Sequence, residues 1–317
     1  MVQLVNLKES LIIFYQKREN IIRPLLKVLL AFAVLCFTQA VFPYNSAVNR
    51  PLLFLLVALV QAFLPITFLY YAASFLIMMN LWTVSADVFL GFVLLFLICL
   101  LTFVRNDGKM GVVTVLIPVL FYLKLEYLIP VILAVTGGFA TILPVVCGTL
   151  IYYLGFYTKD ASTLLTYSAD SDAGMGLSYI VSLMAADRTL LVILVTFFLV
   201  IFVTSLLYRM FYERAWLFAI AVGNAAMAFL LLCGRFIFEL DFTIWRVFLE
   251  ALLSFLICLI IQFFRGIGDI SRMERTSFED DDYIYYVKAV PKIKVTQKKR
   301  NVTNIKSEEA EEDMEEE

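Results

Sequence analysis

Long runs without a charged side chain dominate this sequence. We take eight of these runs, which contain no Lys, Arg, Asp or Glu, as candidate spans: residues 28–49, 51–86, 88–104, 110–123, 127–158, 189–208, 215–234 and 251–264. A helix needs about 20 mainly apolar residues to cross a bilayer. Only 16% of the residues are charged, compared with about 25% in a typical soluble domain. The runs therefore predict an all-α, polytopic membrane helix bundle surrounded by the lipid bilayer.

We predict about eight transmembrane helices, over residues 24–42, 51–72, 87–104, 110–124, 127–154, 190–208, 215–234 and 245–264. Pro65 is expected to kink the second helix, because proline disrupts helical hydrogen bonding. The segment that follows, through Asn80, is expected to be an interfacial connection. Residues 110–123 are short for a span, so they either cross with Lys124 snorkelling to the surface or form half of a re-entrant pair. Residues 158–188 are expected to form a polar connection.

The chain is predicted to have three parts. Residues 1–23 combine apolar residues at helical spacing with lysines and arginines, as in an amphipathic interfacial helix. A signal peptide is the alternative, but the apolar run that follows is long for one, so we favour a retained anchor. Residues 24–264 form the transmembrane helical domain. Residues 265–317 form a tail with a short Tyr-rich segment, a basic stretch and a disordered acidic end.

The distribution of basic residues predicts the orientation in the membrane. With eight spans, both termini lie on one side, and that side carries eleven Lys and Arg residues, including Lys124, against seven on the other, including Arg105, Lys109 and Arg246. Cytoplasmic loops of membrane proteins are enriched in Lys and Arg. We therefore expect a multi-pass protein of the cell membrane with both termini in the cytoplasm.

The composition narrows the chemistry. There is no histidine, which removes the usual general base, the commonest zinc ligand and any Ser-His-Asp arrangement. The five cysteines lie singly in apolar stretches, without metal-ligand spacing. We predict no catalytic residues, no metal site, no cofactor and no nucleic-acid partner, and hence a protein that is not an enzyme.

The fifth apolar run is the most informative for function. It contains a high density of residues that break helices: Pro130, Gly137, Gly138, Pro144 and Gly148. Interrupted helices form the binding sites of many transporters, so these residues are candidates for a substrate pathway. Prolines and glycines also occur in ordinary membrane helices, which is the alternative interpretation.

Ionisable residues near or inside spans are the second group of candidates, because they are costly in a membrane and often functional. Arg235 with Glu239, and Arg246 with Glu250, are each four residues apart and would share a helical face. Together with Asn224 they form a predicted intramembrane polar cluster. The alternative is that the two pairs anchor helix ends and that Asn224 hydrogen-bonds between helices.

Two passages look familiar. Residues 103–153 contain Phe103-Val104-Arg105, Pro118, Tyr127, Pro130, Val146-Cys147-Gly148 and Ile151-Tyr152-Tyr153, and the tail contains the runs 278–283 and 286–292. Together they resemble an uncharacterised family of multi-span membrane proteins from clostridial Gram-positive bacteria, sometimes labelled ABC transporter permease. The resemblance implies a bacterial membrane protein that works with a separate ATPase subunit, and it implies no site residues.

The leading hypothesis from the sequence is a permease-like transporter that moves or gates an unidentified solute through the broken-helix region. The alternative is a non-enzymatic membrane scaffold subunit of an envelope or secretion complex. In that case residues 278–306 of the tail would bind a cytoplasmic protein, with the Tyr-rich segment adding a strand to a partner sheet.

Overall fold

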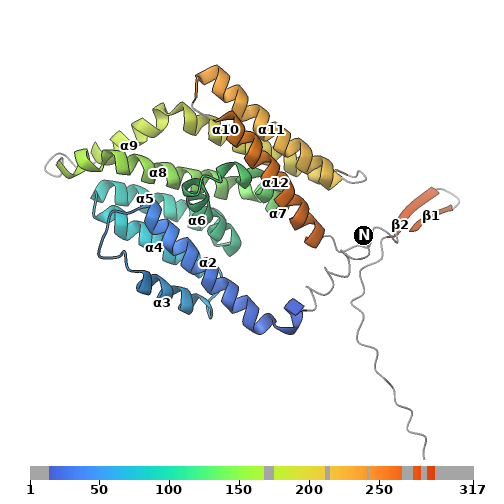
Figure 1. The fold of residues 1–317 in the computed structure, drawn as a ribbon, viewed down its shortest axis with the longest axis horizontal. Helices are drawn as coiled ribbons and strands as arrows, with labels where there is room; N and C mark the ends of the chain where they lie inside the picture. Colours follow the sequence, from blue (N-terminus) through green and yellow to red (C-terminus); the bar gives the residue numbers. More distant parts are fainter. Residues whose placement is uncertain are drawn as a thin grey trace, which may run out of the picture. The chain divides into compact units, whose positions relative to one another are not determined.

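A computed structural model of the chain describes residues 14–167, 175–210, 215–240, 243–265, 274–279 and 284–289. Residues 18–265 form one compact unit, and residues 1–17 with 266–317 form a second. The first unit is a bundle of helices, and the second contains an antiparallel hairpin (Figure 1).

The helices of the first unit are α2 (Glu19–Val41), α3 (Pro51–Gln61), α4 (Phe68–Trp82), α5 (Ala86–Cys99), α6 (Gly108–Tyr122), α7 (Ile129–Gly137), α8 (Ile142–Tyr167), α9 (Met175–Ala186), α10 (Arg188–Tyr208), α11 (Ala215–Phe238) and α12 (Ile244–Arg265). Three short helical turns join some of them: η1 (Leu100–Val104), η2 (Glu126–Leu128) and η3 (Gly138–Thr141). In the second unit, β1 (Glu274–Glu279) pairs with β2 (Ile284–Ala289).

The chain is an integral membrane protein of the multi-pass, helical kind. Six segments are long and apolar enough to cross a membrane: Glu19–Val41, Ala86–Val104, Glu126–Lys159, Arg188–Tyr208, Ala215–Phe238 and Ile244–Phe264. They match six of the predicted spans, because each contains an apolar run nearly long enough to cross the hydrocarbon core. Of the amphipathic helix predicted over residues 1–23, residues 1–13 lie outside the described residues, residues 14–17 are helical, and α2 begins at Glu19 and continues through Pro24.

The prediction for residues 51–86 is wrong. The chain forms two short helices here, α3 and α4, separated at residues 62–67, instead of one kinked span followed by an interfacial connection. Pro65 has no N–H to continue a helical ladder, and the Gln61 side chain donates a hydrogen bond to the Pro65 carbonyl at 3.1 Å. Asn80, expected in the connection, is completely buried within α4.

The polar connection predicted over residues 158–188 is wrong for the residues that the structure describes there, which leave out 168–174. Helix α8 continues to Tyr167, and α9 occupies Met175–Ala186. The signal for α9 is present in the sequence, because residues 173–186 contain no charged side chain. At 12 residues, however, α9 is too short to cross a bilayer by itself.

Contacts between turns define the two ends of the bundle. At the first, which we call the terminal end, the Lys27 ammonium donates to the Leu64 carbonyl at 3.0 Å, Gly108 lies against Thr67, and Gly137 lies near Met110. The Arg209 guanidinium lies over the Phe139 ring, and the Tyr208 hydroxyl donates to Gln262 at 2.9 Å, near the end of α12. These contacts place the turns after α3, η1, α7 and α10 at the same end of the bundle as Arg18 and Arg265, the first and last residues of the unit.

At the opposite end, Asn80 accepts a hydrogen bond from Gln39, and the Tyr44 hydroxyl donates to the Gly155 carbonyl at 2.7 Å. The Arg246 guanidinium, at the start of α12, donates to the Lys124 carbonyl at 2.9 Å. Within the described part of residues 18–265, ten helices, α2 to α8 and α10 to α12, therefore run between the two ends, with α9 remaining beside the opposite end. Helices α3 and α7, with 11 and nine residues, are too short to cross a bilayer by themselves.

These contacts correct the predicted sides of three basic residues. Lys124 and Arg246 were assigned to opposite sides of the membrane, but they are hydrogen-bonded to each other. Arg105 and Lys109, next to Gly108, lie at the terminal end. The physical reason is that α3 and α4 run between the two ends twice where one span was expected, so each loop after α4 lies at the end opposite to the predicted one. Helix α7 is a further passage that was not predicted, so the loops after it return to their predicted ends.

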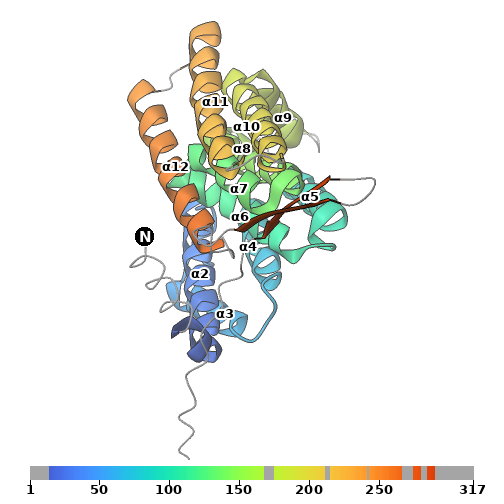
Figure 2. The same ribbon diagram turned by 90° about the vertical axis from the view of Figure 1, so that its right-hand side faces the viewer.

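The core of the described residues contains three clusters of buried side chains. The first comes mainly from α2, α3, α4, η1 and α6, the second mainly from α6, α7, α8, α10, α11 and α12, and the third from α2, α4, α5, α8 and α9. Figure 2 shows α2 and α3 low in the view and α10 and α11 high in it. Helices α6 and α8 approach closely at Gly148 of α8, where an added Cβ would lie 2.7 Å from the Thr114 carbonyl oxygen and 2.8 Å from the Ile117 Cβ. Small residues permit such close backbone approach between membrane helices.

A buried amide pair fixes the turn after α2. The Asn80 carbonyl oxygen accepts hydrogen bonds from the backbone N–H groups of Tyr44 and Asn45, at 3.2 and 2.9 Å, and from the Gln39 amide at 3.3 Å. The Asn80 amide donates to the Gln39 side chain and to the Leu76 carbonyl, each at 2.9 Å. Both polar atoms of Asn80 are thus satisfied away from water, as buried polar groups require.

We expect Asn80→Leu to lower the free energy of unfolding by about 2–3 kcal/mol, because it leaves several buried donors without an acceptor. The measurement is the unfolding midpoint in detergent micelles. Asn106→Leu, at an exposed turn with one 3.5 Å bond, is the matched control and should change little. Equal effects of the two substitutions would contradict this role of Asn80.

Candidate functional site

The interruption predicted in the fifth apolar run is present, and it isolates a short helix. Helix α7 has nine residues, with Pro130 in its first turn and Gly137 at its end. At 1.5 Å per residue it is about 13 Å long, less than half of the hydrocarbon thickness. After it, η3 turns the chain back into α8 at the terminal end. One hydrophobic run is therefore folded as a short and a long helix instead of one span.

Gly138 has the backbone conformation that makes this turn. Its φ is 65° and its ψ is −149°, a region accessible essentially only to glycine. The Arg209 guanidinium lies 3.7 Å from the position that a Cβ on Gly138 would take. A cation near the carboxyl end of α7 is favourable, because the last carbonyl groups of a helix carry partial negative charge.

We expect Gly138→Ala to lower the free energy of unfolding by about 1–3 kcal/mol, the cost of holding a non-glycine residue in this region. Ala140→Leu is the matched control, since Ala140 is exposed two residues later in the same turn. Thermal unfolding in detergent measures both. A Gly138→Ala protein as stable as the wild type would show that the turn can adopt another conformation.

The five residues of the predicted pathway have separate positions along α7 and α8. Pro130 lies in the first turn of α7, Gly137 and Gly138 form its end, and Pro144 lies in the first turn of α8, where proline is tolerated. Gly148 lies further along α8, against α6. The first four thus mark helix boundaries, and the fifth allows two helices to pack.

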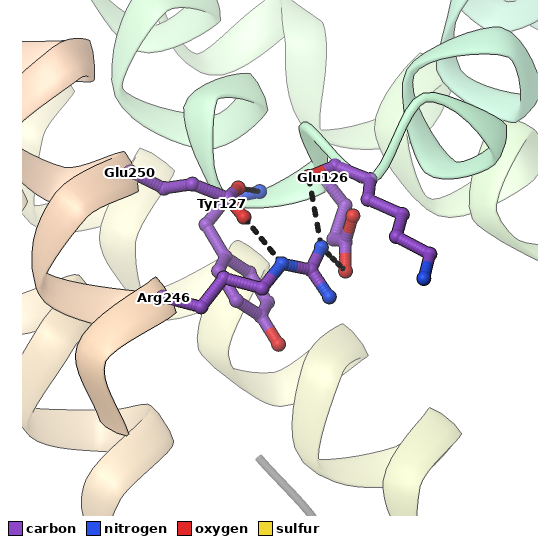
Figure 3. Close-up of polar contacts among 5 residues, drawn as sticks. Glu126, Tyr127, Arg246 and Glu250 are labelled. Atoms are coloured by element: carbon purple, nitrogen blue, oxygen red, sulfur yellow. Dashed lines mark hydrogen bonds and ion pairs between the residues drawn. The ribbon is translucent and has the colours of Figure 1, made fainter. Parts of the chain in front are cut away.

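An ionic cluster lies at the other end of α7 (Figure 3). Arg246 of α12 lies between two carboxylates: its Nη2 is 2.6 Å from Glu126 Oε1, and its Nε is 2.7 Å from Glu250 Oε1. The Arg246 guanidinium also lies 5.3 Å from the centre of the Tyr127 ring. The other Glu250 oxygen accepts a hydrogen bond from the Tyr127 backbone N–H at 3.1 Å. The cluster therefore ties the start of α7 to α12.

Two carboxylates share one hydrogen-bonded guanidinium in this cluster, and the Lys124 ammonium also acts on Glu126 electrostatically. The Glu126 and Glu250 side chains are only 11% and 3% exposed. Glu126 Oε2 is buried and has no hydrogen-bond partner among the described residues. Burying an ionised oxygen without a partner is costly, so this atom is the one polar group of the cluster that a proton or a bound cation would satisfy.

The backbone at Lys124 helps to place Arg246. Lys124 has a φ of 58°, and the Leu125 N–H donates to the Leu120 carbonyl at 2.9 Å, which is the pattern of a Schellman helix end. A left-handed conformation is unusual for lysine. It turns the chain so that the Lys124 carbonyl accepts a hydrogen bond from Arg246.

The predicted polar cluster is only partly assembled. Arg246 and Glu250 form the expected pair. Within the described residues, no ion pair joins Arg235 and Glu239: α11 ends at Phe238, and Glu239 has a φ of 54°, so the two side chains do not share a helical face. Asn224 lies in the middle of α11, where its amide donates to the Ile220 carbonyl at 2.8 Å.

Sequence reasoning missed Glu126 and Tyr127 as partners of Arg246. Glu126 directly precedes the long fifth run, and Tyr127 is its first residue. Its partner is 120 residues away in the sequence, so no local spacing could identify the contact. The available signal was the isolated position of Glu126 at the start of an apolar run.

Comparisons with known proteins do not assign this arrangement. No protein-family model matches the chain, no curated protein matches it, and no solved structure matches it.

Proposed function

We propose that this membrane protein is a permease-like transporter that moves or gates a solute where α7 and α8 meet. The observation that carries the proposal is α7 itself. One of its ends is tied to α12 by the Glu126–Arg246–Glu250 cluster, and the other ends at a glycine-only turn. Short, interrupted helices and intramembrane ionisable groups are both characteristic of transport proteins.

The proposal gives each feature a role. The pathway of Pro130, Gly137, Gly138, Pro144 and Gly148 follows the interrupted segment. The Gly138 turn permits α7 to change its angle relative to α8. The orphan oxygen of Glu126 supplies a position where a proton or cation can change the strength of the link to Arg246. A change in that link would alter how α7 is held against α12.

The test is solute permeation in proteoliposomes, measured by light scattering with glycerol, xylitol, glycine and potassium chloride gradients. We expect the wild type to accelerate equilibration of at least one of these solutes, and Gly138→Ala and Glu126→Gln to reduce it. Glu239→Gln, which alters an exposed glutamate, and Ala140→Leu are the matched controls. Rates equal to those of protein-free vesicles for every solute would overturn the proposal.

We further propose that the terminal end faces the cytoplasm of the cell and that the membrane contains the ten passages in place of eight full spans. With Arg105 and Lys109 moved to the terminal side and Lys124 moved away, the count becomes twelve basic residues against six. With this topology, the excess of Lys and Arg on the side assigned to the cytoplasm is larger, as the positive-inside rule requires.

Cysteine labelling tests this topology. In a background without the five native cysteines, we expect Lys109→Cys to react with a membrane-impermeant maleimide from the same side as Arg18→Cys. Lys124→Cys should react from the other side, because it lies at the opposite end of the bundle. Labelling of Lys124→Cys from the side of Arg18→Cys would restore the eight-span assignment.

A second candidate function is a membrane scaffold, and the hairpin in the tail favours it. Strands β1 and β2 pair in antiparallel register from Glu274 with Ala289 to Glu279 with Ile284. A two-stranded hairpin is marginal alone, and its unpaired edges can accept a strand from a partner. Under this proposal, residues 278–306 bind a cytoplasmic protein.

Affinity purification in mild detergent separates the candidates. Deleting everything after Arg275 should leave permeation unchanged if the helices do the work, and should release the bound proteins if the tail is a docking segment. An ATPase that co-purifies without the tail would support the permease resemblance. Retention of every co-purifying protein after the deletion would exclude the scaffold role of the tail.

A further inference from the structure

We infer that one corner of the terminal end binds the headgroup of an anionic phospholipid. The corner, which we call the basic corner, contains Lys27 of α2, Arg105 directly after η1, and Lys109 in the first turn of α6. The inference concerns a different part of the bundle from α7, and it does not depend on transport.

The three cations lie at the boundaries of apolar segments. Lys27 directly precedes the charge-free run of residues 28–49, and Lys109 directly precedes the run of residues 110–123. Arg105 directly follows the candidate span Ala86–Val104. Headgroups flank the hydrocarbon core of a bilayer, and long basic side chains extend toward them. The charges of the basic corner therefore lie at the depth of the lipid headgroups.

Contacts with the turn between α3 and α4 bring these residues together. Helix α2 packs against α3, α4 and α6 (Figure 1). The Lys27 ammonium donates to the Leu64 carbonyl in this turn at 3.0 Å. Three residues later, Thr67 lies directly against Gly108, so closely that an added Cβ on Gly108 would overlap the Thr67 side chain. Lys27 and Lys109, which follows Gly108, therefore both lie beside the same turn.

The positive charge of the basic corner is available to a ligand. Arg105 and Lys109 are exposed, and neither side chain makes an ion pair or a hydrogen bond among the described residues. Asp107 is the only acidic residue in the two turns that meet here, residues 62–67 and 105–109. Its carboxylate accepts the Lys109 backbone N–H at 3.0 Å as the N-cap of α6. Three cations against this one carboxylate leave a net charge of +2.

Apolar side chains beside the cations identify the ligand as a lipid. Phe63, in the turn that Lys27 contacts, is 93% exposed, and Leu101, four residues before Arg105, is 65% exposed. In a membrane these two side chains contact acyl chains, so the molecule beside the basic corner is a phospholipid. Its phosphate accepts charge-assisted hydrogen bonds from Lys and Arg, and basic pockets between membrane helices bind anionic headgroups in this way.

The experiment is native mass spectrometry of the delipidated full chain, titrated with phosphatidylglycerol or phosphatidylcholine of identical acyl chains. One Lys or Arg near an anionic surface strengthens binding about fivefold, so we expect a preference of about thirtyfold for phosphatidylglycerol. Arg105→Gln with Lys109→Gln should nearly abolish this preference. Lys27 is retained, because its ammonium also holds the turn. Arg50→Gln with Arg235→Gln, which removes two cations from the opposite end, is the matched control and should keep the preference.

Two further arms check the location and the ligand. Arg105→Lys with Lys109→Arg keeps both charges and should bind like the wild type, while elution volume and melting temperature verify that each variant is folded. Glycerol 3-phosphate, which has no acyl chains, should not displace phosphatidylglycerol; displacement would mean that a soluble phosphate suffices and would overturn the lipid. Equal losses in the two glutamine double variants would overturn the location, and equal affinity of the wild type for both lipids would overturn the proposal.

Discussion

Replacing Arg246 with methionine is expected to lower the free energy of unfolding by about 3 kcal/mol or more, because two buried carboxylates lose their shared counter-ion. The Glu126 and Glu250 side chains are 11% and 3% exposed, so neither can recover full hydration. The Lys124 carbonyl loses its hydrogen-bond donor as well. The measurement is equilibrium unfolding in mixed detergent micelles, followed by tryptophan fluorescence.

Two comparisons isolate the charge effect. Arg235→Met removes a guanidinium for which no ion pair is found among the described residues, and should change stability by no more than about 0.5 kcal/mol. Adding Glu126→Gln and Glu250→Gln to Arg246→Met should recover most of the loss, because no buried charge remains and the new amide at position 250 can still accept from the Tyr127 N–H. A triple variant as unstable as Arg246→Met would mean that arginine packing, and not charge balance, stabilises this contact.

Gly148→Leu is the second substitution with a large expected effect. The new Cβ would lie 2.7 Å from the Thr114 carbonyl oxygen and 2.8 Å from the Ile117 Cβ. Both obstacles belong to the rigid part of α6, since one is backbone and the other is attached directly to it. Overfilling a packed contact usually costs about 1–3 kcal/mol, and a leucine adds three further carbon atoms. We expect a loss at or above the upper limit, measured as in the Arg246 experiment.

A graded series checks the cause. Gly148→Ala adds only the Cβ and should lose less stability than Gly148→Leu. Gly91→Ala is the matched control, because its Cβ would meet only the methyl end of the Leu177 side chain, which can rotate away. If Gly148→Leu were tolerated as well as Gly91→Ala, the separation of α6 and α8 would not be limited by this glycine.

Within the ionic cluster, some contacts were predictable from local spacing in the sequence and others were not. The pair of Arg246 and Glu250 was predictable because residues four apart meet on any helix. The same rule was wrong for Arg235 and Glu239, since α11 ends between them and Glu239 takes a left-handed conformation. The contact between Arg246 and Glu126 joins residues 120 apart, and only the packing of η2 against α12 creates it.

The sequence by itself determined that this is a helical membrane protein, where six of its long helices lie, and that its fifth apolar run is interrupted. These properties follow from hydrophobicity and from the backbone restrictions of proline and glycine, which act over a few residues. Tertiary structure alone decided that residues 51–86 form two helices, that Asn80 is buried, and that Lys124 and Arg246 lie at the same end of the bundle. For Asn80 and for the shared end of Lys124 and Arg246, the deciding contribution is the satisfaction of polar groups by partners distant in the chain, which no local pattern encodes. The break between α3 and α4 combines a local cause, Pro65, with a distant donor, because Lys27 satisfies the Leu64 carbonyl.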